Sequence, residues 1–315
     1  MLATVTADDR TEPFEHPALF YRDADEYLAG TLAFIYEGLV RDEPVAVSVP
    51  TANLELIRAA LGASADAVRL MDMTVEGRNP GRIIPGVLRA FTDTHPGKRV
   101  RIVGEPIWAD RSETEYPACA QHEALINAAF AGREVSILCP YNTTELPAHM
   151  VADAHATHPI LIDHSGRNHS GAYDPDSIVA SYNRPLPAPP ADAMVLEFEA
   201  NTLTRVRHTA MAYARDIGMS EYRLVDAELI IAETITNSVV HGGGRGTLSL
   251  WTRDGQLCFQ VDDAGHITNP LAGRLPAPPR VPGGRGLLLV NQLAELVRIH
   301  TGQQGTVLHI RQALI

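Results

Sequence analysis

Three polar side chains lie four residues apart in the segment IAETITNSVVHGGGRG (231–246). Glu233, Asn237 and His241 share one face of the helix expected here, because residues i and i+4 are neighbours on a helix surface. A carboxylate at this position can deprotonate an attacking hydroxyl or water. An amide oxygen can ligate a hard cation such as Mg²⁺, which bridges phosphates. Taken alone, however, a polar pair at this spacing more often marks a solvated helix face.

A second polar element ends a predicted strand at VDDAGH (261–266). The carboxylate of Asp263 can accept a hydrogen bond from the exocyclic amine of adenine. Gly265 allows the backbone to approach a flat ring, because glycine has no Cβ. Asp and Gly are also common turn residues, so an ordinary turn explains this element equally well when it is considered alone.

Glycines directly precede a predicted helix in VPGGRGLLLVNQLAELV (281–297). The first turn of a helix leaves backbone N–H groups unpaired and carries a partial positive charge, so phosphate can bind there. A flexible connection would have the same composition, so this loop alone does not establish a phosphate site.

The clearest boundary in the chain is the proline-rich segment NRPLPAPPAD (183–192), which favours an extended, semi-rigid spacer. Before it, strands and helices alternate. This order predicts a mainly parallel α/β sheet with ligands near the carboxyl ends of its strands. The expected strands are 44–50, 67–74, 99–106 and 134–141, and the expected helices are 51–62, 79–97 and 116–132.

After the spacer the order of elements changes. Two strands flank the Asp254–Gly255 turn, a strong hairpin signal. Helices on one side of a mostly antiparallel sheet predict an α+β sandwich. The expected strands are 194–200, 247–253, 256–263, 298–301 and 306–312, and the expected helices are 202–217, 224–240 and 286–297.

Charge and hydropathy exclude several classes of partner. The 315 residues, enough for about two domains, carry a net charge of −12. Residues 1–192 hold 27 acidic and 15 basic side chains, whereas residues 193–315 hold 11 of each. Such an acidic surface repels phosphate backbones and anionic lipids, so we expect neither nucleic acid nor membrane as a partner. The chain has no apolar run of membrane-spanning length, and its start does not resemble a signal peptide.

The cysteines also bear on the compartment. Cys119, Cys139 and Cys258 are odd in number, far apart and without a CxxC pattern. This argues against a disulfide framework or a zinc site and favours a reducing cytoplasm.

Together, in this order and at these separations, the three polar elements resemble the GHKL (Bergerat) ATP-binding domain of gyrase, Hsp90, histidine kinases and MutL. More narrowly, they resemble the serine kinases that act as bacterial anti-sigma factors. The resemblance covers nearly all of residues 193–315. It rests on Glu-x-x-x-Asn with His-Gly, on Asp-x-Gly and on Gly-x-Gly-Leu, matched here by Glu233, Asn237, His241, Gly242, Asp263, Gly265, Gly284, Arg285, Gly286 and Leu287.

The resemblance implies roles for these residues. Glu233 would be the general base, Asn237 the Mg²⁺ ligand and Asp263 the adenine anchor, and the glycines of the third motif would cradle the phosphates of ATP. Residues 268–282 would form a mobile lid. The chain departs from the pattern at His266-Ile267, where many relatives have a second glycine.

Residues 14–182 resemble the bacterial sensory domain called MEDS, on FYRDADEYLAGTLAFIYEGL, DMTVEGRNPGRII, GEPIW and QHEALINAAF. This resemblance implies a variant of the RecA-like fold. No GxxxxGK[ST] occurs, so we expect no second ATP site of the P-loop kind. The candidates for a sensory pocket are Glu105, Trp108, His122 and Glu123; a core tryptophan with a locally paired His-Glu would explain them equally well.

Three functions remain open. The first is a kinase that binds ATP and Mg²⁺, phosphorylates a serine or threonine of a STAS-type anti-sigma antagonist, and sequesters a sigma factor. The second is a nucleotide-gated sigma-binding module without kinase turnover. The third is a two-component histidine kinase with His122 as phosphoacceptor, which the missing dimerisation hairpin disfavours. Relatives of the anti-sigma type are commonly homodimers.

Overall fold

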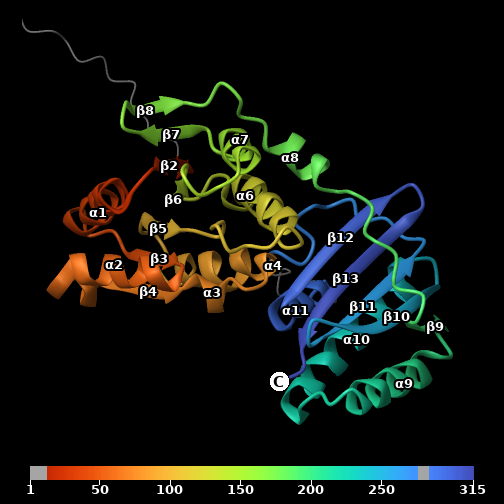
Figure 1. Cartoon of the computed structure of the whole chain (residues 1–315). Coiled ribbons are helices and arrows are strands. Elements are labelled where there is room, and N and C mark those ends of the chain that lie inside the picture. Colours follow the sequence, from red (N-terminus) through yellow and green to blue (C-terminus); the bar gives the residue numbers. More distant parts are fainter. Residues whose placement is uncertain (1–12, 276–283) are drawn as a thin grey trace, which may run out of the picture.

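The computed structural model describes residues 13–275 and 284–315, which contain two β-sheets (Figure 1). The first sheet has the order β4-β3-β5-β6-β2-β7-β8, and β1 pairs with β6. Its strands are β1 (Phe14–Glu15), β2 (Pro17–Tyr21), β3 (Val45–Val49), β4 (Val68–Asp72), β5 (Val100–Gly104), β6 (Val135–Asn142), β7 (Ile160–Asp163) and β8 (Gly166–His169).

Most strand pairs in this sheet are parallel, as the alternation of strands and helices predicts. The hairpin of β7 and β8 adds an antiparallel edge that the sequence analysis does not predict. The first part of the chain is therefore an α/β domain with a mixed, mainly parallel sheet. Its helical segments are α1 (Ala24–Val40), α2 (Thr51–Leu61), η1 (Gly62–Ala67), α3 (Met73–Glu76), α4 (Pro80–Arg82), η2 (Ile83–Arg89), α5 (Ala90–Thr92), α6 (Tyr116–Phe130), α7 (Ala148–Thr157) and α8 (Pro175–Ser181).

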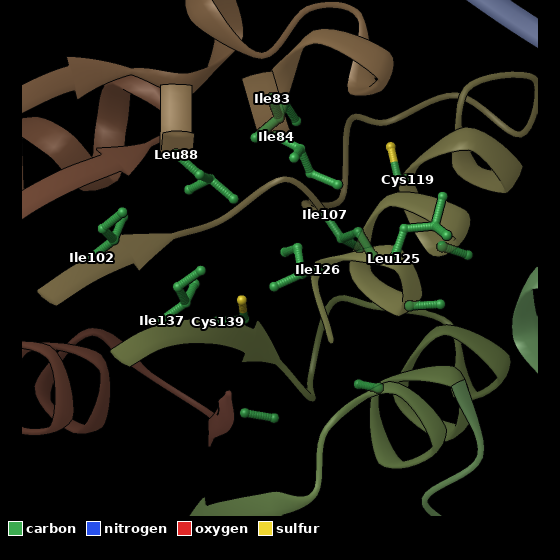
Figure 2. Packing of buried hydrophobic residues seen from close by; sticks show 14 of the residues in the cluster. Ile83, Ile84, Leu88, Ile102, Ile107, Cys119, Leu125, Ile126, Ile137 and Cys139 are labelled. Carbon is green, nitrogen blue, oxygen red and sulfur yellow. The ribbon is translucent and has the colours of Figure 1, made fainter. Parts of the chain in front are cut away.

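Helices cover both faces of this sheet, because alternate strand residues point to opposite sides. Leu138 of β6 belongs to the apolar cluster beneath α1 and α2. Ile137, its neighbour, belongs to the cluster beneath η2, α6, α7 and α8. Figure 2 shows Ile102 on β5 and Ile137 and Cys139 on β6, packed in the same cluster as Ile126 of α6. The strands are therefore apolar on both faces, as in other parallel sheets.

The second sheet is antiparallel throughout, with the order β12-β13-β11-β10-β9. The helices that follow the spacer pack with one face of the sheet in a single apolar cluster. The predicted hairpin is confirmed: Asp254 and Gly255 both have positive φ, as a tight hairpin turn requires. The elements are β9 (Met194–Glu199), α9 (Leu203–Asp216), α10 (Glu221–His241), β10 (Arg245–Arg253), β11 (Gln256–Asp263), α11 (Gly286–Leu293), β12 (Leu296–Gly302) and β13 (Gly305–Ala313).

Two predicted helices differ from the structure. The helix expected at 79–97 is broken into α4, a π-helical segment η2 and α5, because Pro85 lies in its middle and supplies no N–H. The helix expected at 286–297 ends at Leu293, and the chain is extended at Ala294. Leu296 and Val297 instead begin β12 and pair with β13. None of the helices in the described parts of the chain has the length and apolar character of a membrane span.

Polar contacts join the two domains. The buried Asn79 side chain donates a hydrogen bond to the carbonyl oxygen of Asn291 (2.8 Å) and accepts one from the N–H of Val297 (3.3 Å). The carboxylate of Glu295 pairs with Arg78 at 2.8 Å and with Arg223 at 3.1 Å. One residue of the first domain therefore satisfies two backbone groups where α11 ends and β12 begins.

We predict that Asn79→Ala lowers the free energy of unfolding by about 1–3 kcal/mol, because it leaves buried backbone groups without partners. The exposed Asn168 is the control, and Asn168→Ala should change stability by less than about 0.5 kcal/mol. Urea unfolding of the two variants and the wild-type chain measures the difference. Equal midpoints for the two variants would contradict the importance assigned to this contact.

Candidate nucleotide-binding site

The first turn of α11 lies against the polar face of α10. A Cβ placed on Gly286 would lie 2.5 Å from Glu233 Oε2 and 2.9 Å from Asn237 Nδ2, so any larger residue would have to displace the ends of these two side chains. Both polar side chains are partly exposed. The third motif therefore meets the first directly, although about 50 residues of sequence separate them.

Asp263 ends β11 beside the carboxyl end of α10. Its Oδ2 accepts a hydrogen bond from Ser238 Oγ at 2.6 Å, and its Oδ1 accepts one from the N–H of Gly265 at 2.8 Å. A Cβ on Gly242 would lie 2.4 Å from Asp263 Cγ, and a Cβ on Gly265 would lie 2.7 Å from Gly242 Cα. These contacts fix the orientation of the carboxylate, and each of its oxygens retains capacity to accept a further hydrogen bond.

His266 and Ile267, where the chain departs from the family pattern, are held in place by side chains of the second sheet. Thr301 Oγ1 lies 3.1 Å from His266 Nδ1 and accepts a hydrogen bond from the N–H of Ile267 at 3.0 Å. Thr306 Oγ1 donates to the carbonyl oxygen of Gly265 at 2.9 Å. Side chains of β12 and β13 therefore fix the backbone here despite the missing second glycine.

Part of the predicted lid packs against α11. Asn291 Nδ2 donates a hydrogen bond to the carbonyl oxygen of Gly273 at 3.0 Å, and a Cβ on Gly273 would lie 2.6 Å from Leu287 Cβ. Leu271 and Leu275 pack against the apolar cluster of the first domain. The prediction of a mobile lid at 268–282 also covers residues 276–282, which lie outside the described residues.

The start of α11 offers backbone donors. Gly284 has a φ of 76°, in the region that favours glycine, and Arg285 precedes the helix without a side-chain capping hydrogen bond. The first N–H groups of the helix have no intrahelical partner and lie next to the Glu233–Asn237 face. Carboxylate and amide oxygens suit Mg²⁺, and the donors beside them suit phosphate. His241 ends α10; its carbonyl oxygen lies beside Gly265, while the residue is exposed.

The residues proposed for a sensory pocket separate into two groups. Glu105 and Trp108 line a cavity of about 340 Å³ beside the carboxyl end of β5, together with Tyr21, Tyr27 and Asn53. His122 and Glu123 do not line this cavity; both are buried on α6, where they face the interior of the domain.

Glu105 is the most strongly perturbed acid of this cavity. Asn53 Nδ2 donates to both carboxyl oxygens (3.0 and 2.9 Å), and Tyr27 Oη donates to Oε2 at 3.2 Å. Burial nevertheless dominates and raises the pKa of Glu105 from its ordinary value to about 8, against the effect of these hydrogen bonds. The side chain is therefore mainly protonated at neutral pH.

Some residues of the two sites carry no recognisable signal in the sequence. Ser238 directly follows Asn237 on α10, so its closeness to the first motif could have been noticed. Thr301 lies in an unremarkable segment and contacts the residues after Asp263 only in the folded sheet. Asn291 lies in the helix of the third motif, but nothing in the sequence indicates its contact with Gly273.

We predict that the contribution of Glu105 to the free energy of unfolding falls as the pH rises from about 4.5 to about 8, because folded Glu105 keeps a proton that the unfolded chain has lost. Glu105→Gln removes this contribution, so the variant should gain stability relative to wild type across that range. Denaturant unfolding at several pH values measures it. Glu145→Gln, at the same cavity, is the control, and parallel pH curves for wild type and Glu105→Gln would refute the assignment.

Two known protein families match the chain, one in each of the two domains described above. The MEDS family (MEthanogen/methylotroph, DcmR Sensory domain) matches residues 15–159, and the histidine kinase-like ATPase domain matches residues 196–312. No curated protein is detectably similar to the chain.

The solved structures with distant similarity include the following three. The RsbU and RsbW domains of a Mycobacterium tuberculosis protein are 21% identical (TM-score 0.29), and the match covers 41% of this chain and 33% of that one. The flagellar accessory protein FlaH of Methanocaldococcus jannaschii is 14% identical (TM-score 0.31; 48% and 71% covered). The Acinetobacter baumannii histidine kinase AdeS is 11% identical (TM-score 0.24; 76% and 97% covered).

This chain spans about a third of the length of the first of these structures. The domain assignments therefore rest on the family matches and on the two folds described above. The chain combines a MEDS domain with a histidine kinase-like ATPase domain of the GHKL type.

Proposed function

We propose that residues 193–315 bind ATP with Mg²⁺ and form a regulatory protein kinase of the anti-sigma type, with residues 14–182 as its sensory domain and 183–192 as the spacer. The observation that carries this proposal is the contact of Gly286 with Glu233 and Asn237. The proposed general base, the proposed cation ligand and a helix end suited to phosphate are therefore neighbours, which is the arrangement that phosphoryl transfer needs.

Each residue has a distinct role in this proposal. Asp263 accepts a hydrogen bond from the adenine amine, and the first N–H groups of α11 bind phosphate oxygens. Asn237 would hold Mg²⁺, which neutralises phosphate charge when bound. Glu233 takes the proton from the attacking hydroxyl of a serine or threonine on the partner. The proposed partners are a STAS-type anti-sigma antagonist, as phosphoacceptor, and a sigma factor.

One observation favours a sigma-binding module without turnover. The carboxylate of Glu233 lies against the Gly286 backbone, so its role could be to hold the start of α11 rather than to accept a proton. A histidine kinase is disfavoured, because His122 is only 1% exposed and its ring is enclosed by the core of the first domain.

We predict that the chain binds ATP and that Mg²⁺ strengthens the binding in the wild type but not in Asn237→Ala. Asp263→Asn should weaken ATP binding roughly 10- to 100-fold with or without Mg²⁺, because a hydrogen bond to a charged group contributes about 1.5–3 kcal/mol. Calorimetric titration measures both effects. Asp216→Asn, at the exposed end of α9, is the control. Absence of ATP binding to a folded wild-type chain would refute the nucleotide site.

We predict that Glu233→Gln retains ATP binding but slows phosphoryl transfer to a purified STAS-type antagonist about 10²- to 10⁴-fold, as expected for loss of a general base. Glu228→Gln, on the same helix but paired with Arg207, should transfer at the wild-type rate. Transfer is followed with radiolabelled ATP. Undiminished transfer by Glu233→Gln would exclude Glu233 as the base, whereas ATP-dependent sigma binding without any transfer would establish the module.

A further inference from the structure

Four potential metal ligands from separate segments meet inside the first domain. They are His16 between β1 and β2, Glu123 on α6, Cys139 on β6 and His158 directly after α7. One ligand atom of each residue lies within 4.8 Å of the other three, and all four side chains are at most 1% exposed. Cys139 is visible in Figure 2 on the β6 face that packs against α6.

The hydrogen bonds of the two histidines fix their tautomers. His158 Nδ1 lies 2.9 Å from the carbonyl oxygen of Ala154, which is only an acceptor, so Nδ1 carries the proton. His16 Nδ1 lies 3.2 Å from Asn127 Oδ1. The amide of Asn127 is oriented because its Nδ2 donates to the carbonyl oxygen of Thr157 at 2.8 Å. Both histidines therefore direct an unprotonated Nε2 into the cluster, with their Nδ1 positions held as they are in most metal sites.

The cluster has too few donors for its acceptors. Two Nε2 lone pairs and the Glu123 carboxylate face one another, and the thiol of Cys139 offers a single weak S–H donor. With both Nε2 atoms unprotonated, the two carboxylate oxygens of Glu123 and Nε2 of His158 have no hydrogen-bond donor among the described residues. The contacts of Glu123 Oε2 with His16 and His158 are ion pairs only if a histidine is protonated. Buried polar atoms without partners are destabilising, so a cation at the centre would remove a substantial penalty.

The spacing of the atoms fits four-coordinate geometry. Glu123 Oε2 lies 3.3 Å from His16 Nε2 and 3.2 Å from His158 Nε2, and Cys139 Sγ lies 3.4 Å from His16 Nε2. A tetrahedral zinc ion with bonds of about 2.0–2.3 Å separates its ligand atoms by roughly 3.3–3.6 Å. Three of the six edges are close to that separation, and the other three are at most 4.8 Å.

We propose that His16, Glu123, Cys139 and His158 form a structural zinc site. Thiolate and imidazole ligands select zinc over Mg²⁺ or Ca²⁺, and a closed set of four ligands distinguishes the site from an open two-histidine, one-carboxylate iron centre. Binding releases the thiol proton of Cys139 to solvent. The thiolate and carboxylate then carry two negative charges, which Zn²⁺ neutralises in the interior.

This site reverses the expectation drawn from cysteine spacing. Its ligands are spread over more than 140 residues and include one cysteine, so no short motif marks them. In the fold they join β1, α6, β6 and α7, and the ion would fasten the start of the first domain to its centre. A cavity of about 1170 Å³ whose lining includes His16 and Asn127 offers an approach for the ion.

The test uses the full chain, expressed in medium supplemented with zinc or with Co²⁺ and purified without added metal. Elemental analysis should find about one zinc per chain. The cobalt form should show the ligand-field bands of tetrahedral Co²⁺ and a thiolate-to-cobalt charge-transfer band. X-ray absorption should show one sulfur and three nitrogen or oxygen neighbours, a readout that needs no variant.

Cys139→Ser should abolish the charge-transfer band, whereas Cys119→Ser should keep it. Cys119 is an equally buried thiol of the same domain and lies on α6, so it is the matched control. The proposal would be overturned if the folded wild-type chain contained no zinc by elemental analysis and showed no Co²⁺ absorption bands. A charge-transfer band that survives in Cys139→Ser, or a metal without a sulfur neighbour, would also overturn it.

Discussion

The buried residue Asn291 holds helix α11 in place through both its backbone and its side chain. Its backbone carbonyl accepts a hydrogen bond from Asn79 of the first domain, and its side chain donates one to the carbonyl oxygen of Gly273. The other end of the same short helix contacts the polar face of α10 through Gly286. A helix of eight residues is too short to bend appreciably, so its two ends move together. The position of the turn proposed to bind phosphate therefore depends on a hydrogen bond to the sensory domain.

The sequence predicts the periodic and local features of this molecule and misses those that depend on distant contacts. The alternation of strands and helices and the Asp254–Gly255 turn are local features of the sequence, and they predict both sheets. The three polar elements are local as well, and they predict the residues that meet around Gly286. The same reasoning fails where tertiary contacts decide: β12 begins at Leu296 because it pairs with β13, which a helical pattern cannot show. As a charged residue in the sequence, Glu123 is a candidate for a pocket. In the fold, however, α6 directs its side chain toward histidines from other segments of the chain.

A continuous series of contacts leads from the Glu105 cavity to Asn79. Trp108 lines that cavity, and the guanidinium of Arg111 lies over its ring at 4.1 Å. Arg111 donates hydrogen bonds to the carbonyl oxygens of Gly77 (2.6 Å) and Arg78 (3.0 Å), directly before Asn79. A molecule that moved Trp108 would therefore act on Arg111 and, through its hydrogen bonds, on the backbone directly before Asn79.

A second contact reaches the opposite side of the nucleotide site. The side chain of Asn183, at the start of the spacer, accepts from the N–H of Thr301 and donates to its carbonyl oxygen. Thr301 in turn holds His266 and Ile267 after the Asp-x-Gly turn. The sensory domain thus contacts the C-terminal part of α11, and the spacer contacts Thr301; these two segments hold the phosphate side and the adenine side of the proposed site. Contact becomes coupling only if a ligand binds two arrangements of these segments unequally, and ATP must then alter the affinity for that ligand by the same factor.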